Sequence, residues 1–237
     1  MRIHQITDLH VPEENAGQEF DHVKGNILKQ LSYIKSDSSD LLVISGDLTM
    51  TDASIAACEW IESVLPASLN TIVMPGNHDD PKVIWEVFGP ARCIKRSFYF
   101  TLQREQWNIV FLDTSTDTLP ASQLEFLATL PEELPAILFI HHPPDLVSDG
   151  FMALNQPLHN YAQAADAIGR SPIQQVFCGH YHNFAEKECD GFRLHVTSSP
   201  AFQIDLDSVE FKMQPFEPAV RVIELQDEGV STEVIYV

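Results

Sequence analysis

The sequence predicts an α/β fold with a central sheet, because short apolar runs alternate with stretches of helical periodicity along its 237 residues. Most of the runs are almost continuously apolar, which is typical of strands buried on both faces. Polar residues follow five of them directly. The predicted strands are Ile3–Thr7, Leu41–Ser45, Thr71–Met74, Asn108–Leu112, Ala136–Ile140 and Val176–Cys178.

Between these strands, apolar residues recur at helical spacing in three stripes. The stripes cover residues 20–34, 57–65 and 158–168. Gly169 follows the last stripe and is expected to end that helix. Ser122 and Glu125 have the spacing of a capping box and follow Pro120, so a further short helix is expected there.

The end of the chain has a different character. Ala219–Leu225 and Thr232–Val237 read as strands joined across Asp227-Glu-Gly229, which indicates a closing hairpin at about 219–237. The stretch Gln203–Pro218 reads as an ordered or half-ordered loop rather than a boundary. With no internal repeat and no linker, residues 1–237 are expected to form a single domain.

The charge balance of 14 Lys+Arg against 34 Asp+Glu gives a formal net charge of -20. Such a surface repels nucleic acid and anionic membranes, so neither is an expected partner. A phosphate-bearing substrate would need a local positive centre that the basic residues do not supply. A metal ion would provide one.

The four cysteines lie far apart and form no CxxC pair, which favours buried thiols in a reducing compartment over disulfides or a zinc knuckle. The N-terminus lacks the pattern of a signal peptide, and no apolar run is long enough to span a membrane. These observations predict a cytoplasmic protein. Whether it dimerises is left open.

The polar residues after the strands are of the types that bind metals. They are Asp8-Leu-His10, Gly46-Asp47, Gly76-Asn77-His78-Asp79, His141-His142 and Gly179-His180-Tyr181-His182. Each cluster alone has an ordinary explanation as a turn, a helix cap or a strand end. The carboxyl ends of strands in an open α/β sheet, however, meet at one crevice. Five such clusters in order therefore predict one site.

Seven of these side chains are candidate ligands, which is more than one ion can take. They are Asp8, His10, Asp47, Asn77, His141, His180 and His182. The set suits two divalent ions of the borderline to hard class, such as Mn, Fe, Zn or Co, bridged by one carboxylate. In extended backbone His180 and His182 would project to the same side and could serve neighbouring ions, with Gly179 allowing a sharp turn.

These motifs resemble the calcineurin-like metallophosphoesterases, and within them the bacterial class III cyclic-nucleotide phosphodiesterases. The family pattern is Asp-x-His, Gly-Asp, Gly-Asn-His-Asp or Glu, His, and Gly-His-x-His, and every part is matched. One departure is Val11-Pro12 after Asp-x-His, where family members often carry a charged residue. That loop borders the substrate pocket, so base recognition stays open.

The resemblance implies a four-layer α-β-β-α sandwich and a ligand assignment. One metal would be held by Asp8, His10, Asp47 and His182, and the other by Asp47, Asn77, His141 and His180. His78 would be the catalytic residue that does not bind metal, and Asn77 and His78 would contact the substrate phosphate. Manganese or iron is the first expectation for the two ions, with zinc or cobalt as alternatives.

The implied activity is metal-dependent hydrolysis of a small phosphodiester, 3′,5′-cyclic AMP first, by attack of a hydroxide that bridges the two ions. His78 would donate a proton or a hydrogen bond to the leaving oxygen. The alternatives are a broader phosphodiesterase acting on glycerophosphodiesters or 2′,3′-cyclic nucleotides, and a non-catalytic metal-stabilised binding module.

Several neighbouring residues allow more than one interpretation. Asp79 could orient His78 or cap the helix expected near Pro81. His142 is expected to bond other side chains rather than a metal, and Asp113 to sit in a turn. Four further side chains have two possible roles each. The first two could line the pocket mouth, although core packing is expected for them, and the last two could reach the cleft. The four are Phe202, Phe216, His159 and Tyr161.

Overall fold

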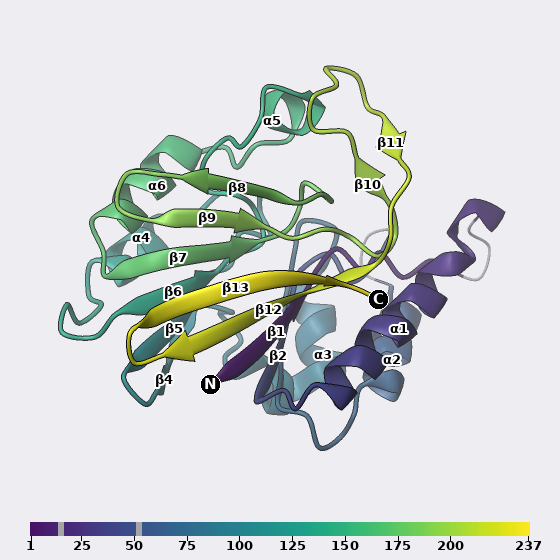
Figure 1. The fold of residues 1–237 in the computed structure, drawn as a ribbon, viewed down its shortest axis with the longest axis horizontal. Coiled ribbons are helices and arrows are strands. Elements are labelled where there is room, and N and C mark those ends of the chain that lie inside the picture. Colours follow the sequence, from purple (N-terminus) through teal and green to yellow (C-terminus); the bar gives the residue numbers. More distant parts are fainter. Residues whose placement is uncertain (14–16, 51–53) are drawn as a thin grey trace.

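Two β-sheets pack face to face at the centre of the molecule, as Figure 1 shows. The structure is a computed structural model that describes residues 1–13, 17–50 and 54–237. The first sheet has five strands in the order β13-β12-β1-β2-β3. They are β1 (Arg2–Ile6), β2 (Leu41–Ser45), β3 (Thr71–Met74), β12 (Ala219–Gln226) and β13 (Gly229–Tyr236).

The second sheet has six strands in the order β4-β5-β6-β7-β9-β8. They are β4 (Phe100–Arg104), β5 (Trp107–Phe111), β6 (Ala136–Phe139), β7 (Ile173–Cys178), β8 (Ala185–Glu188) and β9 (Arg193–Val196). Strands β1, β2 and β3 are parallel, as are β5, β6, β7 and β9. The carboxyl ends within each parallel set therefore face the same way.

The inner faces of the two sheets share one core. Alternate residues of a strand point to opposite faces, so Leu41 and Val43 of β2 enter this core while Leu42 and Ile44 point to the outer side. Phe111, Phe139 and Phe177 of the second sheet meet them there. Neighbouring rings of these three phenylalanines are stacked with centroids 5.5 Å apart.

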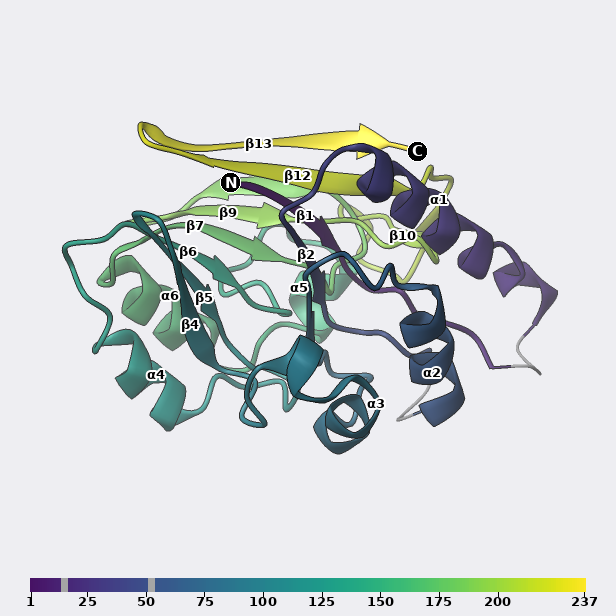
Figure 2. The same ribbon diagram turned by 90° about the horizontal axis from the view of Figure 1, so that it is seen from below.

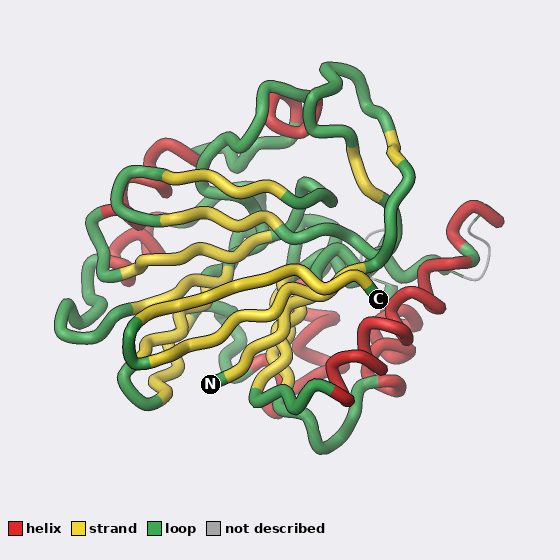
Figure 3. Tube along the Cα trace, in the orientation of Figure 1, coloured by secondary structure: helices red, strands yellow, loops and turns green. Residues whose placement is uncertain are grey.

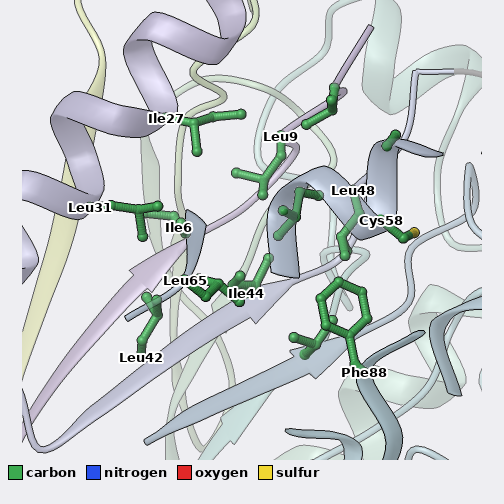
Figure 4. Packing of buried hydrophobic residues seen from close by; sticks show 14 of the residues in the cluster. Ile6, Leu9, Ile27, Leu31, Leu42, Ile44, Leu48, Cys58, Leu65 and Phe88 are labelled. Carbon is green, nitrogen blue, oxygen red and sulfur yellow. The ribbon is translucent and has the colours of Figure 1, made fainter. Parts of the chain in front are cut away.

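Three helices cover the outer face of the first sheet. They are α1 (His22–Ser36), α2 (Ile55–Val64) and α3 (Pro81–Cys93), and a short 3-10 helix, η1 (Gln18–Phe20), precedes them. Figure 4 shows Leu31 of α1 beside Ile6 of the sheet and Ile27 of α1 facing Leu9, with Phe88 of α3 below them. Burial of each such side chain contributes about 1.5–3 kcal/mol.

Helices α4 (Ala121–Leu127) and α6 (Tyr161–Gly169) cover the second sheet from the opposite side, as Figure 2 shows. Leu127 and Ile168 pack there with Leu138 and Val176. A short helix, α5 (Phe151–Asn155), lies near the top of the view in Figure 1. The order of layers is helix, sheet, sheet, helix, which confirms the predicted four-layer α-β-β-α sandwich.

The predicted capping box at Ser122 is wrong. Helix α4 has Pro120 at its N-cap and no side-chain cap, and Ser122 lies inside the helix. The carbonyl of Pro120 accepts hydrogen bonds from the backbone N–H groups of Gln123 and Leu124, so the helix starts before Ser122 could cap it. A different helix, α2, does have a side-chain cap: the hydroxyl of Ser54 accepts a hydrogen bond from Ala57 N.

Several elements were not predicted as strands or helices from periodicity. Strands β4, β8 and β9, visible as yellow segments in Figure 3, carry charged or polar residues in place of an apolar run. Strands β4 and β8 are the two edges of the six-stranded sheet. One face of such a strand can remain in water, so polar residues are accepted there.

Strands β12 and β13 form an antiparallel hairpin around the two residues Asp227 and Glu228. Strand β12 also pairs antiparallel with β1, so the end of the chain extends the first sheet beside its beginning. In the 203–218 region, β10 (Gln203–Ile204) pairs with β11 (Met213–Gln214). The loop of residues 205–212 that connects them lies near the top of Figure 1.

All four cysteines are free, and Cys58, Cys93 and Cys178 are buried. Within residues 1–13, 17–50 and 54–237, no helix combines the length and the apolar character that a membrane crossing requires.

Candidate metal centre

All seven candidate ligands lie just beyond the carboxyl ends of parallel strands. Asp8 and His10 follow β1, Asp47 follows β2 and Asn77 follows β3. From the second sheet, His141 follows β6, and His180 and His182 follow β7. Both sheets therefore contribute to one site where they pack together, which is the arrangement expected at the carboxyl edge of parallel strands.

Six of the seven side chains fall into two groups whose ligand atoms lie within 4.8 Å of one another. The first group is Asp8, His10, Asp47 and His182, and the second is Asp47, His141 and His180. Asp47 is common to both. Its Oδ2 atom lies 3.5 Å from Nε2 of His10 and 3.3 Å from Nε2 of His141. A carboxylate in this place can bridge two ions.

Asn77 would join the second group through its amide oxygen. That Oδ1 atom is buried and has no hydrogen-bond partner, and the same is true of Nε2 of His141. Leaving a buried acceptor without a partner costs about 1–3 kcal/mol, so such atoms call for an explanation. Carboxylate, imidazole and amide donors fit divalent metals of the borderline to hard class. The residues present therefore fit the implied metals.

Backbone carbonyls orient three of the histidines. Nδ1 of His10 lies 3.2 Å from the carbonyl of Thr49, and Nδ1 of His141 lies 2.9 Å from that of Ser45. Nε2 of His180 lies 2.8 Å from the carbonyl of Gln156. An N–H donated to a carbonyl fixes the tautomer and leaves the other ring nitrogen free as a ligand, as is usual around protein-bound metals.

Burial and mutual charge set the protonation of the group. Burial lowers the pKa of His10 to about 4 and that of His180 to about 3. Burial would lower the pKa of His141 as well, but the carboxylates of Asp47 and Asp8 outweigh it and raise this pKa to about 10. Burial would raise the pKa of Asp47, yet His141 and His10 hold it well below its usual value. Ionised Asp47 and the neutral imidazoles of His10 and His180 are already in the forms that bind metal, whereas His141 would release its proton when a metal binds.

Five of the proposed ligands have left-handed backbone conformations. Their φ angles are 53° at Asp8, 41° at His10, 52° at Asp47, 68° at His180 and 56° at His182. Such conformations cost about 1–3 kcal/mol each in a non-glycine residue and gather at functional sites. The expectation that His180 and His182 lie in extended backbone is wrong. They reach different groups because the chain turns at each of them.

Two glycines are required because the strand ends approach one another closely. A Cβ at Gly179 would lie 2.3 Å from Oδ2 of Asp8, and one at Gly46 would lie 2.4 Å from Nδ1 of His141. Gly46 also has a φ of 106°. Gly179 does not have a positive φ, but the chain turns tightly directly after it, with Tyr181 N donating to the carbonyl of Gly179 at 2.8 Å. The absence of a side chain at Gly179 permits the close approach to Asp8 at this turn.

The interpretation of Asp79 as the helix cap is wrong, and its role in orienting His78 stays a prediction. Its buried carboxylate accepts hydrogen bonds from the backbone N–H groups of Leu48, Thr49 and Gly76, at 2.9–3.2 Å. The helix cap is the next residue, Asp80, which accepts from Lys82 N at 2.8 Å. Asp79 therefore ties the loop after β2 to the loop after β3, and so sets the spacing of Asp47 and Asn77.

His142 lies outside both groups, as expected. Its Nδ1 atom lies 2.9 Å from Oγ1 of Thr114, and its Nε2 atom lies 3.2 Å from Oδ1 of Asp117. Its ring packs against that of His180, with centroids 4.1 Å apart. His142 therefore supports the position of His180. Thr114 and Asp117 gave no signal in the sequence, because their partner lies 25 or more positions away.

A cavity of about 380 Å³ opens over the two groups. His78 and Asn77 line it, and His78 belongs to neither group. The backbone N–H of His78 donates to Oδ1 of Asp47 at 2.9 Å, which holds it beside the bridge. The wall of the cavity carries four phenylalanines, namely Phe20, Phe151, Phe202 and Phe211. Phe202 was considered as a lining residue from the sequence, whereas the other three were not selected for the site. His159 and Tyr161 do not line this cavity.

Comparison with known proteins agrees with this geometry. A probable cyclic nucleotide phosphodiesterase from Fibrobacter succinogenes is 29% identical over all of this chain and 94% of its own length. The 3′,5′-cyclic adenosine monophosphate phosphodiesterase CpdA from Escherichia coli K12 is 27% identical over 83% of this chain and 74% of its own. A probable glycerophosphodiester phosphodiesterase GpdQ from Arcobacter nitrofigilis is 24% identical, over 100% and 93%.

Among solved structures, a dimetal phosphatase from Danio rerio has a TM-score of 0.70 at 11% identity, with 99% of this chain and 98% of the other covered. At that identity the likeness concerns the fold. Fold and site together define a metal-dependent phosphoesterase.

The sequence profile described as Calcineurin-like phosphoesterase matches residues 1–184, which include every proposed ligand. The chain belongs to that family.

Proposed function

We propose that this protein is a dinuclear-metal phosphodiesterase that hydrolyses a small phosphodiester, with 3′,5′-cyclic AMP as the first candidate. The proposal is carried by Asp47, which lies in both ligand groups, directly beneath a cavity that also contains Asn77 and His78. The relatives named as cyclic nucleotide phosphodiesterases support the choice of substrate.

The proposed ligands divide as the two groups do. Asp8, His10, Asp47 and His182 would hold one ion, and Asp47, Asn77, His141 and His180 the other. Mixed oxygen and imidazole donors favour manganese or iron, with zinc or cobalt as alternatives. When bound, two such ions would supply an activated water and neutralise charge on the phosphoryl oxygens.

The protein side chains would bind and orient the substrate. Asn77 lines the cavity, and its buried Oδ1 has no hydrogen-bond partner, so its amide could bind a metal and contact a substrate phosphate. His78 lines the same cavity and is free of the metal groups, so it can donate a hydrogen bond or a proton to the leaving oxygen. General acid catalysis of this kind contributes about 10²- to 10⁴-fold.

Charge favours a diester over a monoester or a polyanion. The net charge is -20, and none of the described residues that line the cavity is a lysine or an arginine. A phosphodiester carries one negative charge, whereas a phosphomonoester carries up to two. Less positive charge is therefore needed to balance a diester in this cavity. A nucleic acid strand would be repelled by the surrounding surface.

A broader phosphodiesterase is the second candidate, because a relative over the whole chain is named as a glycerophosphodiester phosphodiesterase. A non-catalytic module is disfavoured, since Asn77 and His78 are both present and both line the cavity. We further propose that residues 1–237 act as one domain in the cytoplasm, where four free cysteines are expected.

The test is a substrate panel on protein reconstituted with manganese. It comprises 3′,5′-cyclic AMP, 2′,3′-cyclic AMP, glycerophosphoethanolamine and p-nitrophenyl phosphate. We expect the highest kcat/KM for 3′,5′-cyclic AMP. A large preference for the monoester would overturn the assignment as a diesterase, and no turnover of any substrate would favour the binding module.

A further inference from the structure

The wall above the metal groups is made of aromatic rings from four separate segments. Phe20 comes from η1, Phe151 from α5, Phe202 from the stretch before β10, and Phe211 from the loop between β10 and β11. Apolar Met50, Met152 and Ile204 also line the cavity. A cavity of about 380 Å³ is at the small end of the range for small-molecule sites.

The four rings form a connected series. The centroid of Phe202 lies 6.4 Å from that of Phe20 and 6.4 Å from that of Phe211, and both pairs meet edge to face. Phe151 meets Phe211 at 5.6 Å in the same manner. Phe202 also packs on the rings of His182 and His10, at 4.4 and 5.8 Å. The aromatic wall therefore begins directly at the metal-binding histidines.

Phe211 stands at the lip of the cavity with 52% of its surface exposed. An exposed phenylalanine is unfavourable in water, and its apolar area would be removed from water by a flat ligand lying against it. Stacking of a base on an aromatic side chain is favourable for every nucleobase, because each presents a π-face.

Gln156 is a polar residue of the wall whose side chain is exposed to solvent and free to contact a ligand. It lines the cavity, and no side-chain hydrogen bond involves it among the described residues. Its backbone carbonyl accepts from His180, so its position relative to the metal groups is set by that bond. A glutamine amide has one acceptor and two donor hydrogens, and it can form a paired contact with the N6 and N7 edge of adenine.

We propose that Phe202, Phe211 and Phe151 together with Gln156 form a nucleobase pocket, which rests on the phosphodiesterase function proposed above. The phosphodiester lies over the metal groups, the base stacks within the aromatic wall, and Gln156 contacts its edge. The substrate class is then a purine nucleotide diester. A quaternary ammonium head group is the rival occupant, since aromatic cages also bind such cations. It would leave the Gln156 amide unused.

The test compares Phe211→Leu and Gln156→Met with wild type, all as the full chain reconstituted with manganese. Neither side chain contacts a proposed metal ligand through a ring or side-chain bond. The readout is kcat/KM for 3′,5′-cyclic AMP divided by kcat/KM for glycerophosphoethanolamine, which has no ring. We expect this ratio to fall about tenfold in Phe211→Leu and about fivefold in Gln156→Met, as loss of part of a stacking or base contact predicts.

Phe216→Leu is the matched control. Phe216 lies in the same 203–218 region but lines a neighbouring cavity of about 820 Å³ rather than the one over the metal groups. Its ratio should stay within twofold of wild type. An equal fall in Phe216→Leu and Phe211→Leu would overturn the pocket assignment, because it would indicate a general effect of the loop.

Two other outcomes also overturn the pocket. One is an unchanged ratio in both test variants, and the other is a strong preference for glycerophosphocholine that Phe211→Leu alone abolishes. Failure of the phosphodiesterase function is distinguishable, because wild type would then hydrolyse no diester. Calorimetric binding of 3′,5′-cyclic AMP decides the pocket in that case: weaker binding by both test variants supports it, and equal binding refutes it.

Discussion

The Nε2 atoms of His10 and His182 lie 2.9 Å apart, although 172 positions separate the two residues in sequence. Two nitrogen ligands at right angles around one ion, each at a bond length of about 2.1 Å, would be about 3 Å apart. Oδ1 of Asp8 lies 3.4 Å from the same His182 nitrogen. The spacing of this pair is therefore the spacing that a shared ion requires.

Replacement of the shared carboxylate should affect both ions. We expect Asp47→Asn to reduce the metal content from two ions to less than one per chain, because a neutral amide no longer balances two cations. Elemental analysis after gel filtration measures it. Asp205→Asn, at a partly buried aspartate that pairs with Lys212 and is not among the candidate ligands, is the control and should keep both ions. Two tightly bound ions in Asp47→Asn would contradict the bridging role.

The role of His78 can be separated from metal binding. His78→Ala should keep both ions and lose about 10²- to 10⁴-fold in kcat, since His78 lines the cavity without belonging to either group. Initial rates and metal content are measured on the same preparation. His159→Ala, at an exposed residue outside the cavity, should match wild type. Loss of an ion from His78→Ala would instead assign this residue to coordination.

Asp79→Ala should destabilise the protein by about 3 kcal/mol or more. It removes the acceptor for three backbone N–H groups, each costing about 1–3 kcal/mol when buried and unpaired. Urea denaturation measures the change. The adjacent Asp80→Ala is a close control, since it removes only the cap of α3 and should cost about 1 kcal/mol. Equal losses in the two variants would show that Asp79 is not the tie between the loops.

A buried histidine far from the metal groups should make stability depend on pH. Burial lowers the pKa of His195 to about 4, and its ring stacks on Phe177 at 5.0 Å. Its folded-state pKa lies below the unfolded value near 6.5, so the unfolded chain binds the extra proton first as pH falls. Between pH 6.5 and 5 this histidine should reduce the free energy of unfolding by about 2 kcal/mol.

The measurement is urea denaturation at pH 6.5 and 5 in EDTA, for wild type and His195→Asn. Metal-site histidines then contribute equally to both proteins, and the difference in pH slope isolates His195. Oε1 of Glu186 lies 3.1 Å from Nδ1 of His195. Burial would raise the pKa of Glu186, but His195 and two nearby arginines outweigh it and lower this pKa, so Glu186 titrates at lower pH. Parallel pH profiles for the two proteins would refute the assignment.

Much of the fold was predictable because its centre is apolar on both faces. Strands β2 and β3 were predicted at their observed bounds, since Leu41–Ser45 and Thr71–Met74 are continuous buried runs. Edge strands such as β8, with the sequence Ala-Glu-Lys-Glu, were not predictable from periodicity. Their pairing is decided by a neighbouring strand, because an edge strand needs no apolar pattern of its own.

The identity of the candidate ligands was also readable in the chain, because parallel strands gather their carboxyl ends at one edge and every candidate follows such a strand. The local spacing of His180 and His182 gave a wrong backbone conformation, because left-handed φ angles replace the expected extended backbone at both residues. The strain of those angles is compensated by bonds to distant segments, such as that from His180 N to the carboxylate of Asp8, at 2.9 Å.

Residue types and their order were enough to predict the α/β class, the family and the candidate ligands of the site, since these follow from local apolar runs and from motif chemistry. The tie made by Asp79, the support of His180 by His142 and the wall of four phenylalanines emerged only once the chain was folded. Each joins segments brought together by packing of two sheets. Contacts of that kind leave no periodic trace in a linear sequence.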